Sequence, residues 1–264
     1  MVGKMIKKDA SEYIVHSVSH AMDILESFLG DDAEQGVTTL SMKLKLPKNN
    51  IFRLLSTLQC RGYVEQNENT GNYRLGMKTF ELGQAFLRRM GLVNQAHSIL
   101  DHLVLQTSET SYLSVYEDGE VIYVDMVETK HPVRIIPMIG KRVPAHCTAV
   151  GKVQLAYKSR EEIKRIIKER GLKPYTPNTM IDEDAFLAHL EEVGRNGYAI
   201  DNEEYEEEVR CVACPVWDYT NSVVAGVTIS GPTLRMPEER IKDTLIPILK
   251  QAALEISHRL GYHI

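Results

Sequence analysis

Five basic side chains and no acidic side chain lie between Val37 and Val64. The basic residues are Lys43, Lys45, Lys48, Arg53 and Arg61. The whole chain of 264 residues has a formal net charge of -5, so this segment is a cationic island on an anionic protein. Clustered lysine and arginine side chains attract anions, and the island therefore predicts an anionic partner such as a nucleic acid.

The apolar residues around the island predict two short helices that would position its charges. Apolar side chains recur at helical spacing over residues 37–44 and again over 51–58. The link between them is short, and Pro47 stands where a helix can begin but not continue. This is the pattern of a helix-turn-helix, whose second helix can enter a major groove. Two β-like runs around an Asn- and Gly-rich turn at 67–72 add a hairpin, which makes the unit a winged helix.

The second helix would turn its polar side chains toward solvent once its apolar stripe is buried. Lys and Arg can neutralise phosphates, while Asn and Arg can pair with base edges. We therefore expect contacts to double-stranded DNA from Thr38, Thr39, Lys45, Lys48, Asn49, Asn50, Arg53, Ser56, Arg61 and Arg74. A helical corner taken from some enzyme is the alternative reading of the helix pair alone.

Composition and length set the frame for the rest of the chain. With 43% apolar and 25% charged residues, it is long enough for two modest cores. We see no N-terminal apolar segment and no apolar run that could span a bilayer, so we expect a cytoplasmic protein without membrane contact. Four cysteines without secretion signals argue against a disulfide framework, and no cofactor is expected.

The predicted organisation has three parts: a winged head over 14–76, a linker helix over 77–91 and a second domain over 92–264. The first helix of the head should cover 15–29 and bury Val18, Met22, Leu25 and Leu29. The linker carries more apolar side chains than the head needs, among them Phe80, Leu82 and Phe86. It is either a dimer-forming helix or a plain connection.

The second domain is predicted to be α+β, an antiparallel sheet with helices beside it. Asp118-Gly119 between alternating apolar runs is a strong hairpin signal for 112–124. Further strands are predicted at 133–136, 209–217 and 223–230, and helices at 148–157, 161–170 and 182–196. A long last helix should begin at Pro237, and Pro247 should bend it.

Several stretches, in this order along the chain, resemble the IclR family of bacterial transcriptional regulators. They are residues 17–25, 46–55, 61–64, 73–76, 144–152, 211–216 and 229–232. The resemblance implies a winged helix-turn-helix head, a linker helix and a GAF-like α/β effector-binding domain, assembled as homodimers or homotetramers on operator DNA. His20, Lys45 and Asn49-Asn50 depart from the family pattern, so no operator sequence is carried over.

The resemblance also implies a pocket for a small-molecule effector that modulates operator binding. Its expected lining is Met138, His146, Cys147, Thr148, Ala149, Asp201, Cys211, Thr228 and Ser230. Thr228 and Ser230 are two apart on a predicted strand, so their hydroxyls face the same way. With the backbone N–H groups at the start of the predicted helix they could hold a carboxylate, which favours a small organic acid. Alternatively, the two hydroxyls satisfy neighbouring backbone groups.

Two other functions were weighed against this one. The sequence has no P-loop, no dinucleotide fingerprint, no nucleophile elbow and no HExxH, so we predict no catalytic residue, and His146 would be the only candidate base for an enzyme. A redox or metal sensor would use Cys211 and Cys214, but residues three apart on a strand point to opposite faces, which favours two core thiols. The acidic residues that follow Asp201, from 203 to 208, are expected to form a solvated loop.

Overall fold

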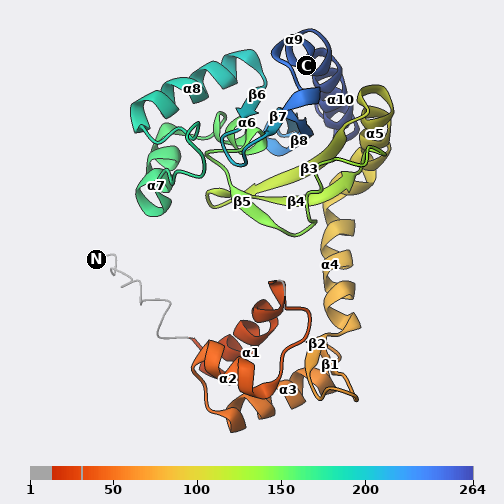
Figure 1. Ribbon diagram of the computed structural model, residues 1–264, viewed down its shortest axis with the longest axis vertical. Helices are drawn as coiled ribbons and strands as arrows, with labels where there is room; N and C mark the ends of the chain where they lie inside the picture. Colours follow the sequence, from red (N-terminus) through yellow and green to blue (C-terminus); the bar gives the residue numbers. More distant parts are fainter. Residues whose placement is uncertain (1–13, 31, 264) are drawn as a thin grey trace, which may run out of the picture. The chain divides into compact units, whose positions relative to one another are not determined.

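The helices of the head form the predicted helix-turn-helix in the computed structural model, which describes residues 14–30 and 32–263 (Figure 1). The elements are α1 (His16–Glu26), the short 3-10 helix η2 (Ser27–Leu29), α2 (Val37–Leu44) and α3 (Lys48–Cys60). The wing is an antiparallel hairpin of β1 (Val64–Gln66) and β2 (Tyr73–Leu75). Both the helix pair and the wing are confirmed.

One apolar core holds these elements together. It contains Ile24, Phe28, Leu40, Ile51, Leu55, Leu58, Val64 and Tyr73. The stripe predicted for the first helix is wrong, because Val18 and Met22 are 54% and 50% exposed whereas Ile24 is fully buried. Helix α1 carries two overlapping apolar stripes, and the one that faces α3 is buried. Spacing alone does not say which stripe that is.

Helix α4 (Met77–Met90) follows the wing, and the chain divides into two compact units between Arg89 and Met90. Phe80 and Leu82 on α4 are 62% and 54% exposed. The side chain of Phe86, which was predicted to join them, lies outside the described residues. The domain limits at 76 and 91 stay a prediction. Helices between residues 14 and 263 are too short or too polar to cross a membrane wherever the structure describes them.

The second unit is built on a six-stranded sheet in the order β5-β4-β3-β8-β7-β6, with every neighbouring pair antiparallel. The strands are β3 (Thr110–Glu117), β4 (Glu120–Val127), β5 (Arg142–Pro144), β6 (Ala199–Asn202), β7 (Val209–Trp217) and β8 (Val223–Pro232). Asp118 and Gly119 join β3 to β4 with φ of 46° and 84°, as a tight two-residue hairpin requires. The predicted hairpin is confirmed.

One predicted strand is wrong and two strands were missed. Residues 133–136 belong to no strand, and Pro132 and Pro137, which cannot donate to a ladder, bracket them. Strand β4 pairs instead with the three-residue β5 on its outer side. Strands β5 and β6 have three and four residues. Runs of that length carry too little alternation to be recognised in the sequence.

Helices cover both faces of this sheet (Figure 1). Helices α5 (Leu92–Thr107) and α10 (Ile246–Arg259) pack on one face, and α6 (Ala149–Leu155) packs on β7 and β8 from the other. Gly226 belongs to the α6 face, since a Cβ there would lie 2.5 Å from the side chain of Val150. The two helices predicted at 161–170 and 182–196 are present as α7 (Arg160–Arg170) and α8 (Glu183–Asn196).

The last helix is interrupted where the sequence predicted a bend. Short helices η3 (Thr233–Arg235) and α9 (Glu238–Arg240) precede a π-helical turn, η4 (Ile241–Leu245), and Pro247 then stands at the start of α10. Pro247 has no N–H to offer the preceding turn, and a wider turn is a common way for a helix to accommodate this loss.

Helix α6 is fixed from inside by a buried cation. Lys152 is fully buried, and its ammonium donates to the carbonyl of Ile200 at 2.6 Å and to the carboxylate of Glu204. Helix α6 also lies very close to the residues before it, because Gly151 touches the backbone of Ala145. These two contacts locate α6 relative to the sheet and therefore position the polar side chains beneath it.

We predict that Gly151→Ala lowers the free energy of unfolding of the second unit by about 3 kcal/mol, through overpacking. A Cβ at this position would lie 2.1 Å from the carbonyl oxygen of Ala145. The change is measured by urea unfolding followed through the fluorescence of Trp217, the one tryptophan in the chain. Gly194→Ala in α8 is the control, since its nearest neighbour, the carbonyl oxygen of Ala156, is 3.6 Å away. Equal midpoints for both variants would contradict the close approach at Gly151.

We predict that Lys152→Met destabilises the same unit by about 3–5 kcal/mol, because the buried Glu204 carboxylate loses its counter-ion. The matched control is Lys158→Met. Lys158 pairs with Glu162 at 3.7 Å, and both side chains are about one third exposed, so the loss should stay below about 1 kcal/mol. Urea titrations at pH 7 give both values, and similar losses would show that the buried pair is worth no more than the surface one.

Candidate functional sites

The corner between α2 and α3 determines how α3 is presented to solvent. Lys45 adopts a left-handed conformation with φ of 55°, which allows the sharp turn after α2. Pro47 is the N-cap of α3, with φ of -57°. The hydroxyl of Ser41 donates to the carbonyl of Leu46 at 2.6 Å. The corner is thus held by hydrogen bonds that do not involve the exposed side of α3.

One side of α3 carries Lys48, Asn49 and Phe52, all exposed. Phe52 was not among the predicted DNA contacts, yet its ring is 56% exposed. It stands off the buried stripe of α3, which was the signal available in the sequence. An exposed aromatic ring beside Asn and Lys is suited to apolar contact with a thymine methyl group.

A groove of about 1160 Å³ runs along another side of α3, between α1 and α4. Its lining combines predicted DNA contacts with exposed apolar side chains: Asn50, Arg53, Ser56, Thr57 and Arg61, together with Val18, Met22 and Leu82. The predicted DNA contacts on α3 therefore divide between two sides of the helix.

The remaining predicted DNA contacts differ in how free they are. Thr38 and Thr39 at the start of α2 are exposed, as are Lys45 and Arg61. Arg74 on the wing pairs with Glu65 at 2.6 Å and with Glu34 at 3.5 Å. The hydroxyl of Ser56 donates to the carbonyl of Phe52 at 2.8 Å. Arg74 and Ser56 would have to exchange protein partners to contact DNA.

The α6 face of the sheet contains a buried polar row. Asp201, Cys211, Ser230 and Thr110 stand directly opposite one another across β6, β7, β8 and β3. All four are at most 7% exposed. Directly paired residues of antiparallel strands share a face, so the row points as a whole toward α6. The next row on this face includes Tyr112 and Thr228.

A cavity of about 60 Å³ lies against this row. Its lining is Tyr112, Tyr123, Ile135, Ile136, Pro137, Met138, Lys141, Thr148, Asp201, Tyr205, Glu206, Val209, Cys211 and Ser230. Sheet residues form its floor, and the irregular segment 135–138 with Tyr205 forms its outer wall. The volume is enough for one or two water molecules and too small for an organic ligand.

Burial keeps the titratable groups of this pocket protonated or close to it. It raises the pKa of Asp201 to about 7, an effect that the nearby Lys152 opposes. It also raises the pKa of Cys211 to about 12, and raises that of Tyr112 well above its ordinary value. The thiol lies 3.2 Å from the hydroxyl of Ser230 and accepts a hydrogen bond from Tyr112 at 3.8 Å. The pocket therefore offers S–H and O–H groups and no thiolate nucleophile.

Thr228 adds an unsatisfied hydroxyl to the same face. Its side chain is fully buried, and its Oγ1 makes no hydrogen bond in the part of the chain that the structure describes. A buried hydroxyl without a partner costs about 1–3 kcal/mol. Thr228 pairs with Tyr112 in the sheet, so this cost falls one row from the pocket.

The predicted pocket residues separate into three groups. Met138, Thr148, Asp201, Cys211 and Ser230 line the pocket. Cys147, Ala149 and Thr228 are buried but do not line it. The hydroxyl of Thr148 donates to the carbonyl of Pro144 at 2.9 Å. Tyr112 and Tyr205 line the pocket and were missed, because aromatic residues on strands and loops are usually core residues.

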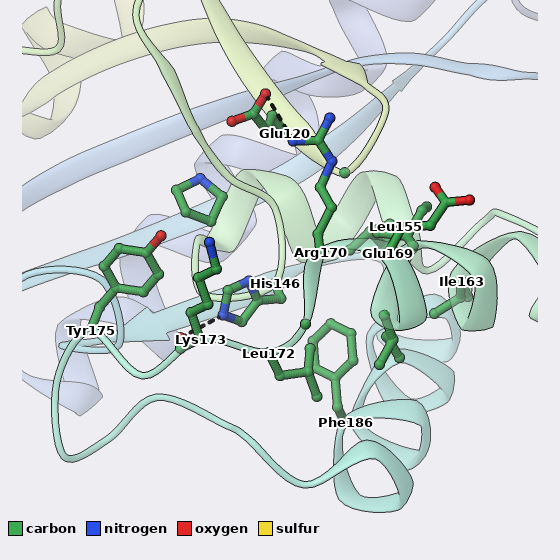
Figure 2. Close-up of a pocket in the computed structure, with 15 residues that line it drawn as sticks. Glu120, His146, Leu155, Ile163, Glu169, Arg170, Leu172, Lys173, Tyr175 and Phe186 are labelled. Atoms are coloured by element: carbon green, nitrogen blue, oxygen red, sulfur yellow. Dashed lines mark hydrogen bonds and ion pairs between the residues drawn. The ribbon is translucent and has the colours of Figure 1, made fainter.

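His146 lies apart from the other predicted residues, in the wall of a different and larger cavity (Figure 2). Its Nε2 donates to the carbonyl of Lys173 at 2.9 Å, and its ring is 6.0 Å from that of Tyr175. Burial lowers its pKa, so the ring is neutral at pH 7. The chain places His146 and Thr148 two residues apart, yet they face two different spaces.

The acidic loop after Asp201 is only partly solvated. Glu204 is 4% exposed and forms the buried pair with Lys152, and its N–H donates to Asp201 at 2.7 Å. The prediction of a solvated side chain is therefore wrong for Glu204, while residues 206–208 are exposed. A run of acids hides this exception because the partner lies 52 positions away.

Cys211 and Cys214 point to opposite faces of β7, and both are free thiols. Burial raises the pKa of Cys214 to about 12. Within residues 14–30 and 32–263, no three His, Cys, Asp or Glu side chains come together in a way that could hold a metal ion.

Comparison with known proteins agrees with this architecture. The model of the IclR helix-turn-helix domain matches residues 17–68, and that of the bacterial transcriptional regulator IclR C-terminal domain matches residues 84–258. The chain is 37% identical to the HTH-type transcriptional regulator KdgR of Escherichia coli strain K12, covering 94% of each chain. It is 34% identical to the regulator XynR of the same strain, covering 94% of this chain and 98% of XynR.

Solved structures show the same likeness. The crystal structure of Thermotoga maritima IclR superposes with a TM-score of 0.77 at 32% identity, over 94% of this chain and 99% of that one. The C-terminal domain of E. coli KdgR superposes with a TM-score of 0.58 at 37% identity, over 65% of this chain and 99% of the domain. Two family models, curated relatives and solved structures thus agree, and the chain belongs to the IclR family of DNA-binding transcriptional regulators.

Proposed function

We propose that a small organic effector binds in the pocket formed by Asp201, Cys211 and Ser230 and changes the affinity of the protein for its operator. The observation that carries this proposal is the buried polar row, together with the unsatisfied Oγ1 of Thr228 one row away. A sheet face that only packed a helix would be apolar, and buried polar groups without partners are retained where a ligand uses them.

The chemistry of the pocket favours a small organic acid that also carries a hydroxyl or keto oxygen. Ser230, Tyr112 and Cys211 supply O–H and S–H donors for a carboxylate or carbonyl oxygen. Asp201, with a pKa of about 7, can accept from a ligand hydroxyl or donate when protonated. Lys141 stands at the rim and provides a cation for the acid group.

Binding requires the pocket to open, and this supplies the coupling. The cavity of about 60 Å³ has room for only one or two water molecules, so the wall formed by Tyr205 and segment 135–138 would have to move outward to admit the effector. The effector then binds the open arrangement and excludes the closed one. Such differential affinity is what a ligand needs to shift a population of conformations.

On the DNA side, α3 would lie in the major groove, with Lys48 and Arg53 giving much of the affinity. We propose that two copies act together, because winged helices read two half-sites of a symmetric operator. Exposed apolar side chains on α1 and α4, among them Met22, Phe80 and Leu82, would form the contact between copies. Large apolar side chains that stay exposed on one copy are candidates for burial against another.

We predict that Arg53→Ala weakens operator binding by about 1–3 kcal/mol, the usual loss for a bidentate base contact. Lys48→Ala should weaken binding to all sequences alike and reduce the slope of affinity against salt by about one. Fluorescence anisotropy with DNA from the protein's own promoter, measured from about 50 to about 200 mM KCl, gives both the affinity and its slope against salt. Lys164→Ala, an exposed lysine on α7, is the control. Parental affinity in the Arg53 variant would exclude this orientation of α3.

We predict that Thr228→Val abolishes the response to effector without loss of stability. Valine has the shape of threonine, and the hydroxyl it removes has no hydrogen-bond partner among the described residues. A thermal-shift screen of organic acids first identifies a binder, since a ligand at 100 times its dissociation constant stabilises by about 2.7 kcal/mol. The variant should lose that shift and keep its own melting temperature. Thr244→Val, an exposed threonine of the same unit, should keep the shift. An unchanged shift in Thr228→Val would place the ligand elsewhere.

A further inference from the structure

A second cavity lies in the second unit, which is called the effector unit from here on. Its volume of about 360 Å³ is six times that of the pocket at Asp201. Figure 2 shows it between the hairpin turn after β3, the C-terminal half of α7, the loop that follows it and α8. Among the nine predicted effector residues only His146 lines it. Its volume lies in the range of about 300–1000 Å³ typical of small-molecule sites.

The inner wall of this cavity is apolar. Leu155 from α6, Ile163 from α7 and Phe186 from α8 line it and are 2%, 6% and 1% exposed. Ile166, Ile167 and Leu172 complete this wall. Such a surface binds hydrocarbon and offers nothing to an ion.

The rim carries two acids and two bases, and three of these four groups have ion-pair partners. Arg170 binds Asp118 at 2.9 Å and Glu120 at 3.6 Å. Glu169 binds Arg165 at 2.8 Å. The ammonium of Lys173 makes no ion pair or hydrogen bond with any residue that the structure describes. The rim is therefore neutral as a whole, and Lys173 is its charged group that has no partner among the described residues.

His146 supplies a hydrogen-bond acceptor in the same cavity. Its side chain is 8% exposed, and Nε2 holds the ring proton because it donates to the carbonyl of Lys173. In the neutral ring, Nδ1 is then an acceptor. Nδ1 has no donor among the residues described in the structure, so it is available to a ligand in the cavity.

We infer that this cavity is a second ligand site, which takes an amphipathic organic anion such as a medium-chain or aryl-substituted carboxylate. The hydrocarbon part would lie against Leu155, Ile163 and Phe186, and the carboxylate would pair with Lys173. A hydroxyl on the ligand could donate to Nδ1 of His146. The site shares no lining residue with the proposed effector pocket, so the inference does not depend on that pocket.

Two contacts connect the cavity to the effector pocket. His146 and Thr148 line the two spaces from either end of one three-residue segment. Tyr175 lines the cavity, Tyr205 lines the pocket, and their ring centroids are 5.3 Å apart. A ligand in the cavity would therefore touch Tyr175, whose ring packs against Tyr205 in the wall of the effector pocket.

The test uses the full chain and straight-chain carboxylates from butanoate to decanoate, each compared with the alcohol of equal length. Isothermal titration calorimetry should show affinity rising about fourfold per methylene until the cavity is full. Each acid should bind about two- to fivefold more tightly than its alcohol, because only the acid pairs with the exposed ammonium of Lys173. Carboxylates that bind no better than alcohols, or acids that fail to bind at millimolar concentration, would overturn the inference.

Three variants locate the binding. Lys173→Gln should remove the preference for acid over alcohol, whereas Lys168→Gln, an exposed lysine of α7 outside the cavity, should keep it. Ile163→Trp should fill the cavity and abolish binding. If Ile163→Trp does not fold, the loss of acid preference in Lys173→Gln still tests the inference. Thr228→Val should bind the acids normally. Loss of binding in Thr228→Val alone would assign the acids to the effector pocket and refute a second site, leaving the proposed function intact.

Discussion

The burial of one ammonium group determines how the effector unit is assembled. Lys152 is fully enclosed between α6 and β6, where an unpaired charge would be very costly, so the chain must bring a carboxylate to it. Glu204 does so, and the loop after β6 turns inward as a result. Asp201 itself lies in β6, and its pairing with Cys211 places it in the polar row. Burial there raises the pKa of Asp201 to about 7, although the nearby ammonium of Lys152 opposes this rise.

The same pair explains why part of the site was beyond the reach of sequence reasoning. The helix-turn-helix, the wing and the hairpin at Asp118-Gly119 are local patterns, and each was predicted because its contacts lie within a few residues. Lys152 and Glu204 are 52 positions apart, and Glu204 sits in a run of acids that reads as solvated. Short strands such as β5 and β6 likewise exist only through their neighbours. Ion pairs and strand pairs between distant residues leave no periodic pattern in the sequence, so they could not be predicted from it.

His146 illustrates a limit of resemblance as well as of periodicity. The prediction groups it with Thr148 because the two are two residues apart in a matching stretch. Residues two apart on a strand would share a face. Residues 145–148 instead form a turn that leads into α6, so nearness in sequence does not imply a shared cavity. In the head the reverse holds: helical spacing identified the face of α3 correctly, but not which of two apolar stripes α1 would bury.

On the proposed function, the charges of the head would concentrate DNA-binding energy at α3. Arg74 on the wing is already paired with Glu34 and Glu65, so exchanging these partners for a phosphate gains little. Lys48 begins α3 next to a corner without acids, and no such exchange is needed there. An anionic protein binds a polyanion only where the local field is positive. At about 0.1 M salt, acids more than about 10 Å away are largely screened and no longer oppose binding. The orientation of α3 on DNA then follows from the position of its free cations.

Two packed tyrosine rings separate the two cavities: Tyr175 lines the larger cavity, and Tyr205 lines the pocket at Asp201. If this pocket takes the effector as proposed, it must widen, and widening would displace Tyr205. A ligand that fills the larger cavity supports Tyr175 from behind and opposes this displacement. Two ligands that press on one wall from opposite sides each weaken the binding of the other by the same factor. On this argument the larger cavity would act against the effector, by holding its pocket closed.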